Sequence, residues 1–178
     1  MRLLKGDYPL KARRLNLTLT QNLELGPGPA WLRLTGDNGL GKTSFIEMVL
    51  IPALTRQQIP FLYFGQDFRT QLYTLKTALA VSFNTRVPHD MTQLLTFWIG
   101  HHRQARVLIL DEFDKYPAHT QHLYRLSREF IRSYVTVSHG DPPLGPGNAF
   151  AQRILQFQPF PAEGALLRVK LEEASPWS

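Results

Sequence analysis

The feature that most constrains the fold is a glycine-rich stretch between a short apolar run and an apolar-periodic one. Residues 36–44 read Gly-Asp-Asn-Gly-Leu-Gly-Lys-Thr-Ser and fit the pattern G-x-x-x-x-G-K-[ST] at every constrained position. Glycines let such a loop turn its backbone N–H groups toward a polyphosphate, Lys42 reaches the β and γ oxygens, and the Thr43 hydroxyl can hold Mg²⁺. The flanking apolar runs at 31–34 and 45–50 supply the strand and helix that the motif needs, and a helix starting near Lys42 adds its positive N-terminal end to the loop. We therefore predict a nucleotide site formed by Gly36, Asp37, Asn38, Gly39, Gly41, Lys42, Thr43 and Ser44.

Length and composition describe one ordinary globular domain. The chain has 178 residues, of which 43% are apolar and 19% charged, and no repeat or linker divides it. No apolar run reaches the roughly 18 residues of a membrane span, and charges at Arg2, Lys5 and Asp7 interrupt any signal peptide. The absence of cysteine excludes disulfides, cysteine nucleophiles and thiolate metal sites. We expect a single cytoplasmic domain over residues 1–178.

The charge balance of the chain is basic. It has 20 Lys and Arg against 14 Asp and Glu, which gives a net charge of +6 and a pI near 9.8. Such a balance favours an acidic partner, either nucleic acid or an anionic membrane face. A nucleotide site itself needs local positive charge, however, and the basic residues are scattered along the chain. Nucleic acid is therefore one candidate partner.

The segments on both sides of the loop predict an α/β fold with a mostly parallel central sheet flanked by helices. Before the loop, residues 10–25 alternate leucines with polar residues, as a half-buried strand or hairpin does, and a turn cluster at 26–29 separates them from the strand at 30–35. We expect these two strands to be antiparallel to each other. After the loop, we predict strands at 60–64, 107–110, 135–138, 154–157 and 166–171, and helices at 43–50, 72–83, 90–100 and 119–134. The first helix should stop at Pro52 and restart or fray through Gln58.

Two carboxylates directly follow the apolar strand at 107–110. Ligands of α/β proteins bind at the carboxyl ends of the strands, so Asp111 and Glu112 should face the phosphate loop. Asp111 is the natural partner of a Mg²⁺ ion held by Thr43, and Glu112 is placed to orient or deprotonate a water aimed at the γ-phosphate. The pair therefore predicts hydrolysis of ATP with Mg²⁺.

Further features, in the same order along the chain, resemble the ABC-type ATPases. Residues 63–68, Tyr-Phe-Gly-Gln-Asp-Phe, look like the glutamine loop of that family, and residues 135–139, Val-Thr-Val-Ser-His, look like its switch histidine after a strand. The resemblance implies that Gln66 meets Mg²⁺ and the attacking water, that His139 is catalytic, and that Tyr8 stacks on adenine. It also implies antiparallel strands before the loop and a role as the nucleotide-binding subunit of a larger complex.

Departures from the family indicate a minimal core with a reduced helical subdomain. The stretch from Gln66 to Asp111 is too short for the full subdomain, and that from Lys42 to Gln66 is too short for the usual β-hairpin. The place of the LSGGQ signature reads Val-Pro-His-Asp-Met at 87–91, without a glycine to open a helix against a partner's γ-phosphate. Asp90 would bring negative charge there, although it can also be an ordinary N-cap. We expect weak ATPase activity unless a protein partner, either a membrane subunit or a second ATPase, completes the site.

Other interpretations stay open. Residues 111–115, Asp-Glu-Phe-Asp-Lys, also resemble the acidic motif of AAA+ proteins, with Ser138 as a polar sensor, although both ends of this chain are predicted to be β. Within the ABC-type interpretation three roles compete. The chain is a transporter subunit peripheral to the inner face of a membrane, a soluble ATPase acting on nucleic acid, or a regulatory module that binds nucleotide without hydrolysis.

Overall fold

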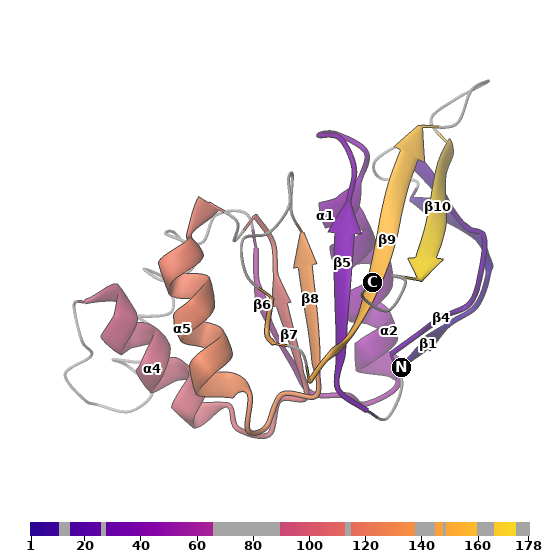
Figure 1. The fold of residues 1–178 in the computed structure, drawn as a ribbon. Helices are drawn as coiled ribbons and strands as arrows, with labels where there is room; N and C mark the ends of the chain where they lie inside the picture. Colours follow the sequence, from indigo (N-terminus) through magenta and orange to yellow (C-terminus); the bar gives the residue numbers. More distant parts are fainter. Residues whose placement is uncertain are drawn as a thin grey trace.

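A computed structural model describes residues 1–10, 15–25, 28–65, 90–112, 115–137, 145–147, 149–159 and 166–173. Within these residues, a mixed sheet is covered by helices on both faces (Figure 1). The predicted helix at 72–83 and most of the reduced helical subdomain lie outside them, as do Gln66, Ser138 and His139.

The central sheet has eight strands in the order β2-β3-β10-β9-β5-β8-β7-β6. Neighbours from β9 to β6 are parallel to each other, β10 is antiparallel to β9 but parallel to β3, and β2 is antiparallel to β3. A separate antiparallel pair joins β1 to β4. The mostly parallel sheet with antiparallel strands before the loop is thus confirmed. The bounds are β1 (Arg2–Leu3), β2 (Gly6–Leu10), β3 (Leu15–Leu19), β4 (Leu23–Glu24), β5 (Ala30–Thr35), β6 (Phe61–Phe64), β7 (Val107–Leu110), β8 (Ser133–Val137), β9 (Ala151–Pro159) and β10 (Leu166–Glu173).

The strands that precede the phosphate loop differ from the expected pair. The alternating segment at 10–25 forms the end of β2 and all of β3 and β4, and both β9 and β10 lie between β3 and β5 in the sheet. The strand at 30–35 does run antiparallel to β3, as expected, because β9 is parallel to β5 and β10 reverses the direction before β3. The two strands are not neighbours, however. Alternation identifies the buried face of a strand, but it carries no information on which strand lies beside it.

One continuous helical run follows the phosphate loop. It consists of α1 (Lys42–Phe45), a π-helical turn η2 (Ile46–Leu50) and α2 (Ile51–Arg56). The sequence predicts a stop at Pro52 and a restart or fraying through Gln58; the run instead continues through Pro52 without a break and ends at Arg56. A proline lacks the N–H donor and its ring crowds the carbonyl four residues earlier. The wider π turn lies just before Pro52, which occupies an N-terminal position of α2 where a missing donor costs little.

The helices α4 (Met91–His101) and α5 (Pro117–Ser127) pack together on the other face of the sheet (Figure 1). The carboxylate of Asp90 accepts a hydrogen bond from the backbone N–H of Gln93 at 3.0 Å, so Asp90 is the N-cap of α4. This outcome confirms the N-cap alternative. Among the described residues, no helix combines the length and the apolar character needed to cross a membrane.

The helix α5 ends earlier than predicted, at Ser127 instead of residue 134. Tyr134, which continued the helical spacing in the sequence, belongs to β8 and is fully buried. Its hydroxyl shares a 2.9 Å hydrogen bond with the Ser127 hydroxyl, and its ring meets Tyr124 edge to face. Burial raises the pKa of Tyr134 to about 12. The apolar spacing of α5 continues in the sequence as far as Tyr134, beyond the end of the helix, because β8 packs against α5 and buries its residues in the same cluster.

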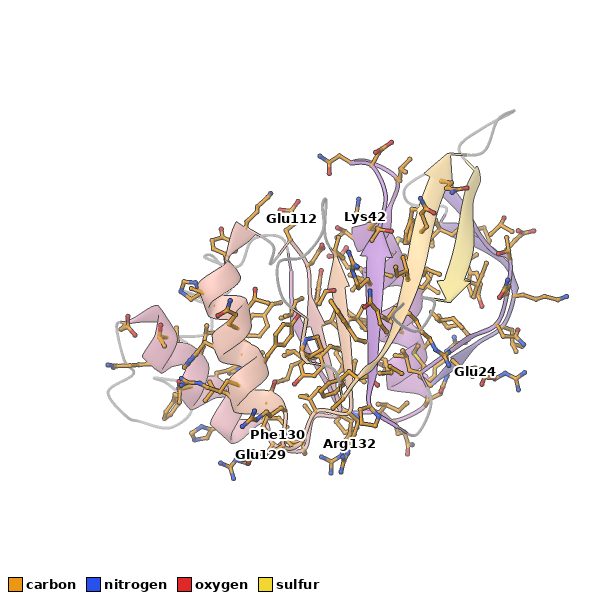
Figure 2. The ribbon with its side chains drawn as sticks, in the orientation of Figure 1. Glu24, Lys42, Glu112, Glu129, Phe130 and Arg132 are labelled. Atoms are coloured by element: carbon orange, nitrogen blue, oxygen red, sulfur yellow. The ribbon has the colours of Figure 1, made fainter. Side chains whose placement is uncertain are left out.

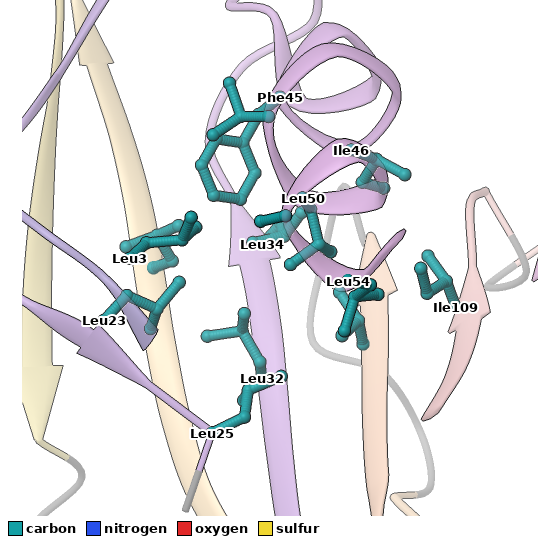
Figure 3. Close-up of a cluster of buried hydrophobic side chains, with 14 of the residues drawn as sticks. Leu3, Leu23, Leu25, Leu32, Leu34, Phe45, Ile46, Leu50, Leu54 and Ile109 are labelled. Carbon is teal, nitrogen blue, oxygen red and sulfur yellow. The ribbon is translucent and has the colours of Figure 1, made fainter. Parts of the chain in front are cut away.

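Each face of the sheet has its own apolar core. On one face, Leu32 and Leu34 of β5 pack with Phe45, Leu50 and Leu54 of the helical run, all nearly inaccessible to solvent (Figure 3). The other face of β5 carries Trp31, which belongs to the cluster formed with α4 and α5. A strand covered on both faces needs apolar residues at successive positions, which explains the unbroken apolar run of β7. The polar residues within β5 and β8, Arg33, Ser133 and Thr136, are buried as well.

Candidate nucleotide site

The phosphate loop and the acidic pair lie at the same edge of the sheet. The loop leaves the carboxyl end of β5 and the pair leaves that of β7, with the parallel strand β8 between them. Figure 2 shows Lys42 and Glu112 close to this edge. The parallel arrangement of strands therefore brings two distant sequence motifs together, as the sequence predicts.

The backbone of the loop depends on glycine at its entrance and exit. Gly36 has φ 127° and Gly41, the N-cap of the helical run, has φ 89°, both in the region that L side chains rarely adopt. A Cβ on Gly36 would also lie 2.5 Å from the backbone oxygen of Phe157 in β9. Gly36 is therefore required by a close approach of β9 as well as by its conformation. The exposed positions Asp37, Asn38 and Gly39 form the outer rim between these glycines.

The side chain of Lys42 is hydrogen-bonded to the backbone of the phosphate loop. Its ammonium donates hydrogen bonds to the backbone oxygens of Gly36 at 2.7 Å and Asp37 at 2.8 Å. The residue is only 5% exposed, so its charge sits beneath the loop backbone. No acidic residue lies in the first turn of the helix that starts here, and the helix end adds its own positive potential. The centre of the loop is thus a positive, largely buried position.

Thr43 and Asp111 meet beside this ammonium-bearing loop. The Thr43 hydroxyl donates a 2.8 Å hydrogen bond to the Asp111 carboxylate, and Asp111 is 1% exposed. Mg²⁺ prefers hard oxygen ligands, and a hydroxyl beside a carboxylate is a donor set of that kind. The two predicted metal residues therefore fit the ion by position and chemistry. Ser44, the next loop residue, lies half-buried in the first helical turn.

Glu112 has an unusual backbone conformation and an ion-pair partner that the sequence interpretation missed. Its φ of 56° lies in the left-handed region, which for a non-glycine residue costs about 1–3 kcal/mol and is concentrated at functional sites. Its carboxylate forms a 2.7 Å ion pair with Lys115, and the two side chains are 21% and 58% exposed. An acidic residue followed three positions later by lysine is the signal that would have predicted this contact.

Comparison with known proteins finds distant likenesses. No protein-family model matches the chain, and no curated protein matches it. Among solved structures, a KaiC-like protein of the hyperthermophilic archaeon Pyrococcus horikoshii is similar over 80% of both chains, with 15% identity and a TM-score of 0.46. Trip13 of Rhizobiales is similar over 73% of this chain and 45% of its own length, with 18% identity and a TM-score of 0.39. At these TM-scores neither likeness bears on the function of this chain.

The strand order, the loop after β5 and the carboxylate after β7 decide the fold class on their own. The chain has a P-loop NTPase fold. Its phosphate loop starts from an interior strand and runs directly into a helix, and its second motif follows a strand two places away in the sheet.

Two residues near Asp111, Tyr63 and Glu47, were not named as site residues in the sequence interpretation. The Tyr63 hydroxyl on β6 donates to the Glu47 carboxylate on the helical run at 3.3 Å. Burial raises the pKa of Tyr63, and the negative charges of Asp111 and Glu47 raise it further. Tyr63 is therefore a neutral hydrogen-bond donor near both carboxylates. Their positions in the sequence could have indicated this contact, because Glu47 lies in the helical run after the loop and Tyr63 lies near the end of β6, beside β7.

Tyr8, which the family resemblance places against adenine, lies on β2 opposite Leu17 of β3. Its hydroxyl donates to the backbone oxygen of Leu4 at 2.6 Å, and its ring packs against the core on the side of the helical run. Burial raises its pKa. The adenine contact stays a prediction, as do the roles of Gln66 and His139, which lie outside the described residues.

Proposed function

We propose that the chain binds ATP with Mg²⁺ and hydrolyses it. The observation that carries the proposal is the contact of the Thr43 hydroxyl with the Asp111 carboxylate beside the loop that encloses the Lys42 ammonium. A buried cation next to a buried carboxylate suits a ligand that brings negative phosphate oxygens together with a divalent cation. A nucleoside triphosphate has this composition.

Each residue has a definite part in the proposed reaction. Lys42 binds phosphate oxygens, and Thr43 and Asp111 would hold the metal ion. When bound, Mg²⁺ offsets the negative charge of the phosphate oxygens as a Lewis acid. Glu112 orients the attacking water and accepts its proton, since it follows Asp111 at the same strand end. Because Lys115 pairs with Glu112 in this structure, the carboxylate exchanges that partner for the water when it acts.

The metal part of this proposal predicts the behaviour of Asp111→Asn. Asparagine keeps an oxygen that accepts from Thr43, so the fold should persist while one anionic ligand is lost. We expect calorimetric titration with ATP to show at least about a tenfold loss of the affinity gained from added Mg²⁺, with little change in its absence.

A matched control lies outside the site, where the Thr18 hydroxyl donates to the Asp7 carboxylate at 2.6 Å. Asp7→Asn alters the same kind of threonine–aspartate contact and should leave the Mg²⁺ effect intact. An Asp111→Asn protein that binds ATP with the full Mg²⁺ dependence of the wild type would show that the Thr43–Asp111 contact is structural.

We further propose an ABC-type core whose second half-site comes from a different protein, either a membrane subunit or a second ATPase. The family resemblance puts the signature segment at 87–91, and helix α4 begins at the end of this segment. The carboxylate of Asp90 already occupies that helix end as the N-cap. A γ-phosphate from a second copy would meet this negative charge where the family uses an uncharged helix end.

This proposal predicts that the chain does not form a homodimer with ATP. Sedimentation of the Glu112→Gln protein, which should retain ATP, is expected to give a monomer with and without ATP and Mg²⁺. Asp90→Ser keeps a capping oxygen without its charge, and is the variant in which any weak self-association should increase. A stable ATP-dependent homodimer of the Glu112→Gln protein with Asp90 in place would contradict the need for a different partner.

A further inference from the structure

Three turns lie at the end of the sheet away from the nucleotide site. Residues 56–60, 102–106 and 128–132 lead from α2, α4 and α5 into β6, β7 and β8. These strands are parallel neighbours, so all three turns reach the same edge. Figure 2 shows Arg132 at this edge, at the opposite end of the sheet from Lys42.

Backbone hydrogen bonds place the three turns side by side. The N–H of Arg106 donates to the oxygen of Pro60 at 2.7 Å, and the N–H of Arg132 donates to the oxygen of Arg106 at 2.8 Å. The guanidinium of Arg106 also donates to the oxygen of Phe130 at 3.2 Å. The three turns therefore form one continuous rim at this end of the sheet.

The rim is strongly basic, although its charges are spread over residues 56–132 of the sequence. Its turns contain five arginines and one carboxylate, and all six side chains are exposed. Within the part of the chain that the structure describes, none of these arginines forms an ion pair, whereas the exposed Arg2 pairs with Glu24 at 3.0 Å. We call this rim the arginine edge, and it comprises Arg56, Arg103, Arg106, Arg128 and Arg132, with Glu129 as its carboxylate.

We propose that the arginine edge binds the phosphate backbone of double-stranded nucleic acid. Guanidinium groups are weakly hydrated and bind phosphate oxygens in pairs of hydrogen bonds, which lysines do not. Like charges gathered on one rim repel each other, and a polyanion removes that repulsion. The exposed residues Gln58 and Gln104 of the same turns add uncharged donors of the type that contacts phosphates and sugars.

The side chains around the arginine edge favour a duplex over two other polyanionic surfaces. A membrane surface is bound through exposed apolar side chains as well as charge, and the large exposed ones among the described residues are Leu4 and Met48, both outside the three turns. Single strands are bound by stacking on exposed aromatic rings. The aromatic residue of these turns, Phe130, packs against the core on the α4 and α5 side.

This inference goes beyond the proposed ATPase function and does not depend on it. The test is fluorescence anisotropy of the full chain with a duplex DNA of about 30 base pairs, over a series of salt concentrations. Each phosphate that the protein neutralises contributes about −0.9 to the slope of log K against log salt concentration. Five phosphate contacts would therefore give a slope of about −4.5, and fewer contacts a shallower one. Arg103→Gln/Arg132→Gln should reduce the magnitude of the slope by about 2 and weaken binding at 50 mM salt by about tenfold or more.

The matched control is Lys5→Gln/Lys170→Gln, which removes the same number of charges at two positions outside the three turns, one just before β2 and one in the sequence of β10. Its slope should stay within about 0.5 of the wild type. ATP affinity should be unchanged in both double variants. An equal loss in both would show that binding follows net charge alone and would overturn the arginine edge. Stronger binding to single-stranded DNA, or to vesicles with anionic lipid but not to duplex, would overturn the assignment to double-stranded nucleic acid.

Discussion

Replacing Lys42 with alanine is expected to weaken ATP binding by about 10- to 100-fold. A hydrogen bond to a charged group contributes about 1.5–3 kcal/mol, and the buried ammonium of Lys42 is the positive charge at the centre of the loop. The variant also loses the two hydrogen bonds from this ammonium to Gly36 and Asp37, so the loop backbone is less restrained. Calorimetric titration, with thermal unfolding as a check on folding, measures the effect.

Comparing ligands separates the two consequences of Lys42→Ala. If the ammonium binds phosphate, the variant should lose far more affinity for ATP and ADP than for adenosine, whereas a disordered loop would weaken all three alike. Lys5→Ala, which removes one exposed lysine outside the site, should bind ATP as the wild type does. A folded Lys42→Ala protein with wild-type ATP affinity would refute the assignment of the phosphate loop.

Glu112→Gln is expected to lower the rate of ATP hydrolysis by about 10²–10⁴-fold while ATP affinity changes by no more than about threefold. Glutamine keeps the shape of the side chain and one acceptor oxygen, but it cannot take a proton from water. Single-turnover hydrolysis, measured next to equilibrium binding, distinguishes a loss of chemistry from a loss of substrate.

Lys115→Gln is the matched control for this prediction because it breaks the same 2.7 Å ion pair and leaves the carboxylate in place. We expect its turnover to equal or exceed that of the wild type, since Glu112 no longer has to leave a cationic partner. Equal losses in the two variants would mean that the ion pair positions the strand end and that Glu112 is not the base.

The parts of the site that follow from sequence are those in which one local motif specifies its own surroundings. The loop at 36–44 required a strand before it and a helix after it, and both are present. The acidic pair required a buried strand that ends beside the loop, and the 2.8 Å contact between Thr43 and Asp111 confirms that geometry. These predictions succeeded because parallel strands necessarily bring their carboxyl ends to one edge.

The parts that did not follow from sequence depend on distant or competing interactions. The neighbours of β3 are set by pairing with β10, from the other end of the chain. Pro52 lies within the helical run because a π-helical turn precedes it, and the helix propensities of single residues do not predict such a turn. The left-handed conformation of Glu112 contradicts the local preference of a non-glycine residue, so sequence patterns do not predict it.

The position of β10 between β3 and β9 also sets the order in which the molecule can assemble during its synthesis. About 150 residues separate β3 from β10, so at about 5–20 residues per second the ribosome makes β10 roughly 8–30 s after β3. Until then the hairpin of β2 and β3 has an unpaired edge, and a lone two-stranded hairpin is marginal in water. The strands that carry the phosphate loop and the acidic pair are complete before β10 is made. The nascent chain can therefore form the candidate nucleotide site before β3 has its second neighbour, β10. During this interval the unpaired edge of the β2–β3 hairpin is exposed to aggregation.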